Sequence, residues 1–471
     1  MDFPYGKAPL AILIVALLTG GTLLAINLST EQARKPDLVL ATFDKDQAAI
    51  YAAALPEFEK KHNCKVQVQL VDQRAIIYRL QSAMQVGAEV PDLAEVIYYG
   101  MGSFVRGPIE DVGFADLTER LHTSGMWDRI LNSRFRMWSS RGHVFALPHD
   151  VHPVMLVYRK DLIEQEGIDV RELDTWDKFV KVGRRVTRDR DGDGNIDRYM
   201  LDLQTQAGDY LRLLMNQRGT DVFDDQGEVA FDNETVVDTV CWYIKAIEGK
   251  DRIAFPAGWG QTLSRAMIDG LCLFYICPDW RTRQIKIDIP SLEGKLALMP
   301  LPAWEPGGRR TSTWGGSGLG ISKQCQEKGK FDLAWELAMY LYYDPPQLEQ
   351  RFLQTHIIPP LKESWKMPGF DKPFDYYGGI PLGRTYIDLA PQVPSVQTHA
   401  FQTMAQGKLS MGYEAALIYY KQHGDDGLRD FVRKELKTQA DAAREVVARN
   451  PFLRASKPMA QSGAQPAEVA R

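Results

Sequence analysis

The chain has 471 residues, of which 45% are hydrophobic and 25% are charged, and its formal net charge at pH 7 is −5. This length is sufficient for two lobes with separate hydrophobic cores, and the composition is typical of a soluble globular protein. The negative charge, together with the lack of a stripe of Lys and Arg interleaved with aromatic residues, argues against a nucleic-acid-binding surface.

The N-terminal segment is predicted to direct the rest of the chain out of the cytoplasm. Residues 8–28 form a run of 21 residues without a charge, which is long enough to cross a bilayer core of about 30 Å. A cleaved signal peptide is the alternative, but no A-x-A cleavage site is present and no cysteine directly follows the run for lipid attachment. We expect residues 1–36 to be a membrane anchor (a transmembrane helix) or a signal segment, and we favour the uncleaved anchor.

Strands and helices alternate after this segment. Residues 38–42 and 93–97 are continuous apolar runs, and residues 66–70 alternate apolar and polar side chains, so each is predicted to be a strand. Residues 47–62 and 76–86 have apolar side chains at helical spacing. The alternation predicts an α/β fold with a mostly parallel sheet covered by helices on both faces.

Four residues follow the ends of these strands. Phe43 and Asp44 come after the first strand, and Tyr98 and Tyr99 come after the third. Ligands of such sheets bind at the carboxyl ends of the strands. These four residues are therefore predicted to lie at a ligand-binding edge.

The middle of the chain has the pattern expected of a hinge. Residues 144–147 are a short apolar strand ended by Pro148, and a second apolar run, residues 154–158, follows without an intervening turn. Two strands in this arrangement suggest a chain that leaves one sheet and enters another. Asp174 or Thr175 is then predicted to cap a helix.

The rest of the chain returns between the two lobes. Residues 295–301 are predicted to cross back, residues 314–322 to rejoin the first lobe, and residues 331–343 to form a helix. The first lobe is then residues 37–150 plus about 305–345, and the second lobe is residues 151–304 plus about 346–450. Residues 456–471 are polar and rich in Ala, Pro and Gln, which predicts a disordered tail.

Several segments, in order, resemble one protein family. Residues 142–178, GHVFALPHDVHPVMLVYRKDLIEQEGIDVRELDTWDK, resemble the extracellular solute-binding proteins of ABC importers, the maltose-binding-protein-like sugar binders of family 1. Arg159 stands where that family has Asn. Further similar segments are GAEVPDLAEVI at residues 87–97 and the regions 267–280, 299–302 and 314–322. The resemblance covers about residues 37–450.

The resemblance implies a fold and a function. The fold is α/β and periplasmic-binding-protein-like of type II, with two lobes of parallel-rich sheets joined by a multi-crossing hinge. The function is the capture of a carbohydrate or similar small solute for the permease subunits of an ABC transporter, at the periplasmic or extracellular face of the cytoplasmic membrane. Two alternatives remain open, a membrane-anchored carbohydrate sensor or accessory protein and an extracellular carbohydrate-active enzyme with a carboxylate pair such as Asp150 and Asp279. We expect no catalytic residues, because no motif requires catalysis.

Aromatic and polar side chains suited to a sugar occur side by side in the sequence. A sugar packs its C–H face against an aromatic ring, while its hydroxyl groups bind carboxylate, amide or guanidinium groups. Asp279, Trp280 and Arg281 supply these chemistries together, and the resemblance places family ligand contacts at Trp280 and Trp314. The predicted ligand-binding residues are Phe43, Asp44, Tyr98, Tyr99, His149, Asp150, Asp279, Trp280, Arg281, Trp314, Gly315 and Gly316.

Residues 189–197, DRDGDGNID, resemble the start of an EF-hand calcium loop. Carboxylates at the first, third and fifth places repel one another unless a cation neutralises them, and Gly194 at the sixth place permits a tight turn. The twelfth place is Met200, where an EF-hand has Glu. A solvated acidic turn is the alternative, and we expect a structural Ca²⁺ site. The predicted ligands are Asp189, Asp191, Asp193, Asn195 and Asp197.

Overall fold

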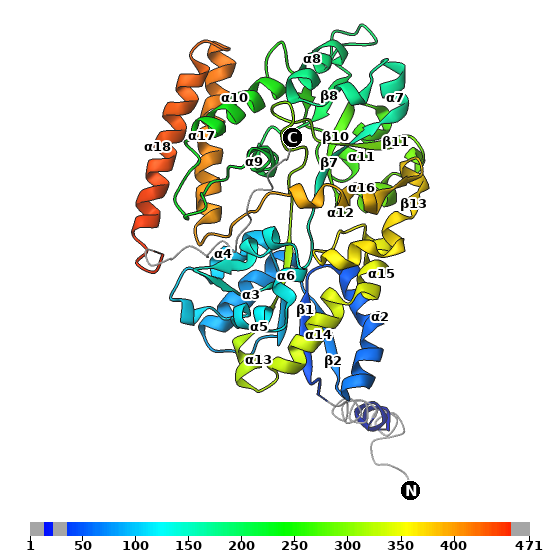
Figure 1. Cartoon of the computed structure of the whole chain (residues 1–471), viewed down its shortest axis with the longest axis vertical. Coiled ribbons are helices and arrows are strands. Elements are labelled where there is room, and N and C mark those ends of the chain that lie inside the picture. Colours follow the sequence, from blue (N-terminus) through cyan, green and yellow to red (C-terminus); the bar gives the residue numbers. More distant parts are fainter. Residues whose placement is uncertain (1–13, 22–34, 454–471) are drawn as a thin grey trace, which may run out of the picture.

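The structure is a computed structural model and describes residues 14–21 and 35–453. Two five-stranded sheets lie in two lobes, one above the other in Figure 1. The first sheet has the order β2-β1-β3-β12-β6 and the second has the order β11-β7-β10-β8-β9. The strands of the first are β1 (Leu38–Thr42), β2 (Val66–Leu70), β3 (Leu93–Ile97), β6 (Leu147–Pro148) and β12 (Ser317–Ile321). Those of the second are β7 (Val154–Arg159), β8 (Tyr199–Asp202), β9 (Ala254–Phe255), β10 (Cys272–Pro278) and β11 (Leu296–Pro300).

Both sheets are mixed, and each contains two parallel and two antiparallel strand pairs. In the first sheet β1 pairs in parallel with β2 and β3, while β12 runs antiparallel to both β3 and β6. In the second sheet β10 pairs in parallel with β8, and β8 with β9, while β7 runs antiparallel to β10 and β11. Two short ribbons, β4 (Ser139–Ser140) with β5 (His143–Val144) and β13 (Pro373–Phe374) with β14 (Ile380–Pro381), lie outside these sheets.

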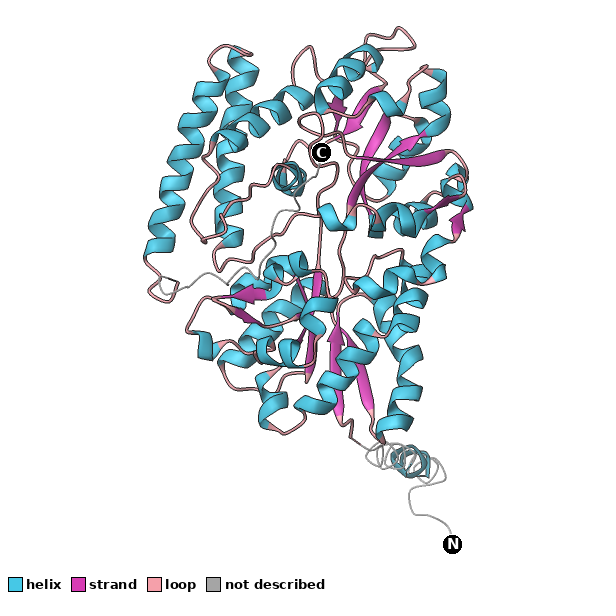
Figure 2. Cartoon of the chain, viewed as in Figure 1, coloured by secondary structure: helices cyan, strands magenta, loops and turns pink. Residues whose placement is uncertain are grey.

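Helices cover both faces of each sheet (Figure 2). Alternate residues of β7 face opposite ways, so that Val154 and Leu156 join one buried cluster of the second lobe while Met155 and Val157 join another. The C-terminal helices α17 (Gln402–His423) and α18 (Leu428–Ala448) form an antiparallel pair that packs against α10 (Glu234–Ile247) of the second lobe.

The α-helices are numbered in the order of the chain. They are α2 (Lys45–His62), α3 (Gln73–Gln85), α4 (Tyr98–Phe104), α5 (Thr118–Thr123), α6 (Met126–Arg129), α7 (Lys160–Gln165), α8 (Trp176–Val186), α9 (Gly208–Gln217), α10 (Glu234–Ile247), α11 (Gln261–Asp269), α12 (Asp279–Asp288), α13 (Lys323–Glu327), α14 (Phe331–Tyr343), α15 (Pro345–Thr355), α16 (Leu382–Ile387), α17 (Gln402–His423) and α18 (Leu428–Ala448).

The first crossing of the hinge lies where the sequence predicts it, but the return crossing does not, because residues 295–301, which the sequence predicts to cross back, include β11 of the second sheet. The chain passes from β6 in the first sheet to β7 in the second through residues 149–153, and it returns from β11 to β12 through residues 301–316. The two crossings touch each other, because Pro153 forms an isolated bridge with Thr313. His152 adopts a left-handed backbone conformation with φ of 53°, which is uncommon for a residue other than glycine.

One predicted strand is wrong. Residues 144–147 do not form a single strand, because Val144 ends β5, which pairs with β4, whereas Leu147 begins β6, which pairs with β12. Phe145 and Ala146 between them are buried but belong to neither strand. Thr175 rather than Asp174 caps α8, since its hydroxyl accepts the backbone N–H of Lys178.

Two sequence predictions concern residues beyond those described. The structure describes only residues 14–21 of the apolar run 8–28, and the C-terminal segment 456–471 lies outside the described residues. Within residues 14–21 and 35–453, no helix is both long and apolar enough to cross a membrane. The anchor and the tail therefore stay predictions.

The glycines of β12 allow large side chains to lie directly on the strand. A Cβ atom on Gly318 would lie 2.6 Å from the ring of Trp138, and one on Gly320 would meet the ring of Phe114. Both rings belong to the core of the first lobe and are fully buried. These two glycines therefore serve packing within the first lobe.

We predict opposite effects of alanine at two glycines. Gly318→Ala should lower the free energy of unfolding by about 1–3 kcal/mol, because the methyl group overlaps the Trp138 ring. Gly407→Ala, in the middle of α17 with no atom within 4 Å of the new methyl group, should raise it by about 0.5–1 kcal/mol. Urea unfolding of the two variants measures both changes, and a neutral Gly318→Ala would contradict this account of the strand.

Candidate functional site

The ends of strands from both lobes meet at the cleft between them. On the first-lobe side α4 begins directly after β3, and on the second-lobe side α12 begins directly after β10. Figure 2 shows the two sheets separated by loops that cross from one lobe to the other. The side chains at these element ends therefore face one another across the hinge.

Three tryptophans form an aromatic cluster on the second-lobe side. The ring of Trp314 lies edge to face with the rings of Trp259 and Trp280, at centroid distances of 5.6 and 5.7 Å. The indole N–H of Trp280 donates to the backbone carbonyl of Trp314 at 3.0 Å, which ties α12 to the returning crossing. Trp259 is 46% exposed, whereas Trp314 is 8% exposed. The Trp259 ring is therefore the most accessible to a ligand.

Arg281 packs beneath this cluster. Its guanidinium carbon lies 4.6 Å from the ring centre of Trp259 and 5.8 Å from that of Trp314. One nitrogen donates to the carbonyl of Ile276 at 2.7 Å, while Nε and Nη2 have no hydrogen-bond partner among the described residues. Because buried polar groups are normally paired, these two nitrogens are unused donors next to the aromatic cluster.

Asp202 binds Tyr210, whose ring lies edge to face with that of Trp314, and the sequence alone did not single this aspartate out. It ends β8 and accepts hydrogen bonds from the backbone of Ala257 at 3.0 Å and from the hydroxyl of Tyr210 at 3.2 Å. Burial raises the pKa of its carboxyl group. A polar residue at the end of an apolar strand, as in YMLD, is the signal that could have identified it.

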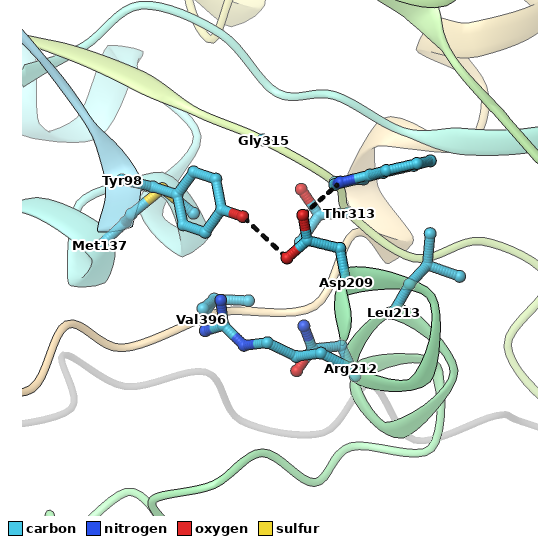
Figure 3. A pocket seen from close by; sticks show the side chains of 10 residues that line it. Tyr98, Met137, Asp209, Arg212, Leu213, Thr313, Gly315 and Val396 are labelled. Carbon is cyan, nitrogen blue, oxygen red and sulfur yellow. Dashed lines mark hydrogen bonds between the residues drawn. The ribbon is translucent and has the colours of Figure 1, made fainter. Parts of the chain in front are cut away.

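Asp209 links the two lobes across the cleft (Figure 3). The hydroxyl of Tyr98, at the start of α4, donates to Asp209 Oδ1 at 3.1 Å, and the indole of Trp314 donates to Oδ2 at 3.3 Å. Burial and the adjacent carboxylate raise the pKa of Tyr98, so its hydroxyl remains a donor. The cavity that Tyr98 and Asp209 line has a volume of about 20 Å³, which is room for water only.

A buried ionic network occupies the hinge itself. His152 Nδ1 lies 2.6 Å from Asp279 Oδ1, and His152 Nε2 lies 3.2 Å from Asp150 Oδ2. Burial alone would lower the pKa of His152, but Asp150 and Asp279 outweigh it and raise the pKa to about 9. Arg134 pairs with Asp150 at 3.2 Å from the other side. His152 is therefore an imidazolium between two carboxylates at neutral pH.

The remaining oxygens of this network bind backbone amides. Asp150 Oδ2 accepts the N–H of Ser317 at 2.8 Å, and Asp279 accepts those of Trp280 and Ile358, each at 2.8 Å. His149, Asp150 and Asp279 are buried with 2%, 1% and 0% of their surfaces exposed. The structure thus places three of the predicted ligand-binding residues inside the hinge, where they hold protein segments together.

The other predicted residues lie around the cleft. Asp44 caps α2 by accepting the N–H groups of Asp46 and Gln47, and Phe43 packs against the first-lobe core. Tyr99 is 36% exposed and lies edge to face with Tyr98. The carbonyl of Gly316 accepts the N–H of Tyr98 at 2.9 Å, while a Cβ on Gly315 would meet the His152 and Trp280 side chains.

The acidic loop lies on the surface of the second lobe, between α8 and β8. Carboxylate oxygens of Asp189, Asp191 and Asp193 lie within 4.8 Å of one another. Hydrogen bonds from the backbone of Gly194 and Gly192 lower the pKa of Asp189. Of the remaining two predicted ligands, the carboxylate of Asp197 pairs with Arg190 at 3.1 Å, whereas Asn195 is predicted to bind through its backbone carbonyl, and its side-chain amide donates to Asp193.

The chain belongs to the family of bacterial extracellular solute-binding proteins, whose sequence model matches residues 41–347. It is 24% identical over 335 residues to the arabinooligosaccharide-binding protein of Halalkalibacterium halodurans, an alignment that covers 70% of this chain and 72% of that protein. It is also 24% identical over 329 residues to the lactose-binding protein of Rhizobium radiobacter, covering 69% of this chain and 74% of the relative. The family predicted from the sequence is thereby confirmed.

Solved structures show the same fold. The sugar-binding protein MalE of Xanthomonas citri superposes with a TM-score of 0.70 at 19% identity, over 87% of this chain and 99% of that chain. The transporter-associated binding protein of B. animalis subsp. lactis, solved with β-1,6-galactobiose, superposes with a TM-score of 0.64 at 19% identity, over 87% of this chain and 98% of that chain. The predicted two-lobed type II fold is confirmed.

We predict that stability falls as the pH rises from about 6.5 to 9. The pKa of His152 is about 9 in the folded protein and about 6.5 in the unfolded chain, so the folded state binds the proton more tightly. The resulting stabilisation is fully present below pH 6.5 and is lost as the pH passes 9, with a loss on the order of 3 kcal/mol. Chemical unfolding at several pH values measures this slope.

The other buried histidines do not interfere in that range, because burial lowers the pKa of His149, lowers that of His356 to about 3 and lowers that of His399 to about 4. His152→Gln should flatten the slope, whereas His122→Gln, at an exposed histidine, should leave it unchanged. A wild-type stability that is constant between pH 6.5 and 9 would contradict the assignment of a bridging imidazolium.

Proposed function

We propose that this solute-binding protein captures a carbohydrate between its lobes and presents it to the permease subunits of an ABC transporter. The named relatives support this ligand class, since they bind arabinooligosaccharides and lactose. The family description supports a location outside the cytoplasmic membrane, in the periplasm or at the cell surface. The two lobes would capture and release the ligand by rotating about the two crossings, which contact each other at Pro153 and Thr313.

The observation that carries the proposal is the aromatic cluster with charged groups on both sides. Trp259, Trp280 and Trp314 offer ring faces or edges at the cleft, Arg281 has two unpaired donors beneath them, and Asp209 offers carboxylate oxygens beside them. Sugars need these features together, because their C–H faces pack on rings and their hydroxyls bind charged groups.

The family is one of binding proteins, and we propose that the chain has no enzymatic activity. Asp150 and Asp279, the carboxylate pair considered for an enzyme, are buried and both are engaged by His152. A glycosidase needs carboxyl groups that reach the glycosidic bond. A role as a sensor or accessory protein would use the same cleft, and the presence of permease genes next to the gene for this chain would distinguish transport from that role.

A thermal-shift screen tests the ligand class. Arabinooligosaccharides, lactose, maltose and β-1,6-galactobiose, together with polyols and polyamines as other classes, are the appropriate set. A ligand at about 100 times its dissociation constant should stabilise the protein by ~2.7 kcal/mol. Stabilisation by a non-carbohydrate alone would contradict the proposed function.

We predict that Trp280→Ala weakens sugar binding by about 1–3 kcal/mol while the fold persists, because one ring of the cluster is lost. Trp304→Ala is the matched control, since Trp304 packs against Trp176 and Trp242 in the second-lobe core. The control should lower the melting temperature and leave affinity unchanged. Calorimetric titration gives the affinities, and intact affinity with a collapsed melting temperature for Trp280→Ala would assign that ring to the core.

We also propose that the acidic loop binds a structural Ca²⁺. Three carboxylates lie close enough to share one cation, and calcium prefers such oxygen ligands. We expect EGTA to lower the melting temperature and excess Ca²⁺, but not Mg²⁺, to restore it. Asp191→Ala should abolish the response, and a melting temperature that EGTA leaves unchanged would exclude the site.

The N-terminal segment is proposed to remain attached as a membrane anchor. The motivation is the uncharged run of residues 8–28 without an A-x-A site. Mass spectrometry of the membrane fraction should find peptides from this segment, whereas a mature protein that starts near Ser29 would show that it is removed.

A further inference from the structure

We propose that Asp209 is a principal acceptor for the hydroxyl groups of the ligand, and that the hydroxyl of Tyr98 occupies this acceptor when no ligand is bound. We call the hydrogen bond between Tyr98 and Asp209 the latch, because it joins the two lobes. The inference rests on the proposed function, because it assigns roles within the same cleft. Two features point to it, namely the pairing of Asp209 with donors from two different segments and the position of the Tyr98 ring beside a fixed guanidinium.

The two carboxylate oxygens of Asp209 accept hydrogen bonds from donors in different parts of the protein. Oδ2 accepts from Trp314, which belongs to the aromatic cluster, so this contact orients the carboxylate beside the rings. Oδ1 accepts from Tyr98, which belongs to the other lobe. When the lobes separate, Tyr98 leaves and Oδ1 becomes free to accept a hydroxyl, while Trp314 keeps the carboxylate in position.

Tyr98 resembles part of a bound sugar in size and polarity. Its six-membered ring carries one hydroxyl that binds a carboxylate, and the guanidinium carbon of Arg212 lies 5.7 Å from the ring centre. Arg212 is itself fixed, because Asp221 accepts two hydrogen bonds from it at 2.9 and 2.7 Å. Figure 3 shows Tyr98, Asp209 and Arg212 lining one small cavity.

The Tyr98 contact competes directly with a ligand. The cavity beside it has a volume of about 20 Å³, so a sugar ring fits only after Tyr98 has moved away from Asp209. The lobes also meet through Arg136 with Asp225 and through Arg283 with Asp46. The side chain of Asp225 is exposed and those of Arg136, Arg283 and Asp46 are half-buried, and neither pair includes a side chain of the aromatic cluster, Tyr98 or Asp209.

The test uses two variants that remove the same hydrogen bond from opposite sides. Tyr98→Phe keeps the ring and removes the latch, so the dissociation constant of the sugar found in the screen should fall about three- to tenfold. Asp209→Asn removes the charged acceptor, so the dissociation constant should rise about ten- to a hundredfold. Calorimetric titration measures both.

Matched controls are available for both changes. Tyr78→Phe makes the same substitution on α3 at a residue that is 70% exposed, and Asp177→Asn changes an exposed aspartate in the first turn of α8, the position that Asp209 has in α9. Neither control should change the affinity. Small-angle scattering of the protein without sugar should show a larger radius of gyration for Tyr98→Phe and for Asp209→Asn than for the wild type.

Each part of the inference can fail by itself. If Tyr98→Phe weakens binding, Tyr98 is a ligand contact and the latch is wrong. If Asp209→Asn strengthens binding or leaves it unchanged, Asp209 is not the acceptor. If the wild type binds no sugar, the proposed function and the acceptor role both fail, while scattering still decides the latch, which unchanged radii in both variants would overturn.

Discussion

The ionic bridge of His152 between Asp150 and Asp279 is the interaction on which the rest of the site depends. Asp150 lies in the crossing from β6 to β7, and Asp279 begins α12. Through backbone amides the same two carboxylates also hold the start of β12 at Ser317 and the segment at Ile358. His152, Asp150 and Asp279 together therefore join four segments of the chain at the point where the lobes meet.

Such a network fixes the relative positions of the segments that it joins more than it raises the free energy of unfolding. A buried ion pair loses solvation that its attraction only partly recovers, and replacing it by apolar residues is often neutral. Here the carboxylates are satisfied by amides from several segments, so removing one partner would leave an uncompensated charge in the hinge. The aromatic cluster depends on this order, because Trp280 follows Asp279 directly and binds the carbonyl of Trp314.

The elements that local sequence determines could be predicted, and those set by distant partners could not. The strands Leu38–Thr42 and Leu93–Ile97 and the helix Phe331–Tyr343 lie where their apolar patterns place them. The split of residues 144–147 into two strands depends on which partner each half meets. Asp209 has the appearance of an ordinary acidic residue at the start of a helix, and its partner Tyr98 is 111 residues away in the sequence.

The most direct test of the central claim is a crystal structure with the carbohydrate that gives the largest thermal shift. The account predicts that the sugar lies between the lobes, with a ring packed against the tryptophan cluster and a hydroxyl on Asp209, and that Tyr98 no longer contacts this carboxylate. A sugar bound elsewhere, such as in the open surface pocket of about 600 Å³ beside α11, with the Tyr98–Asp209 bond intact, would contradict it.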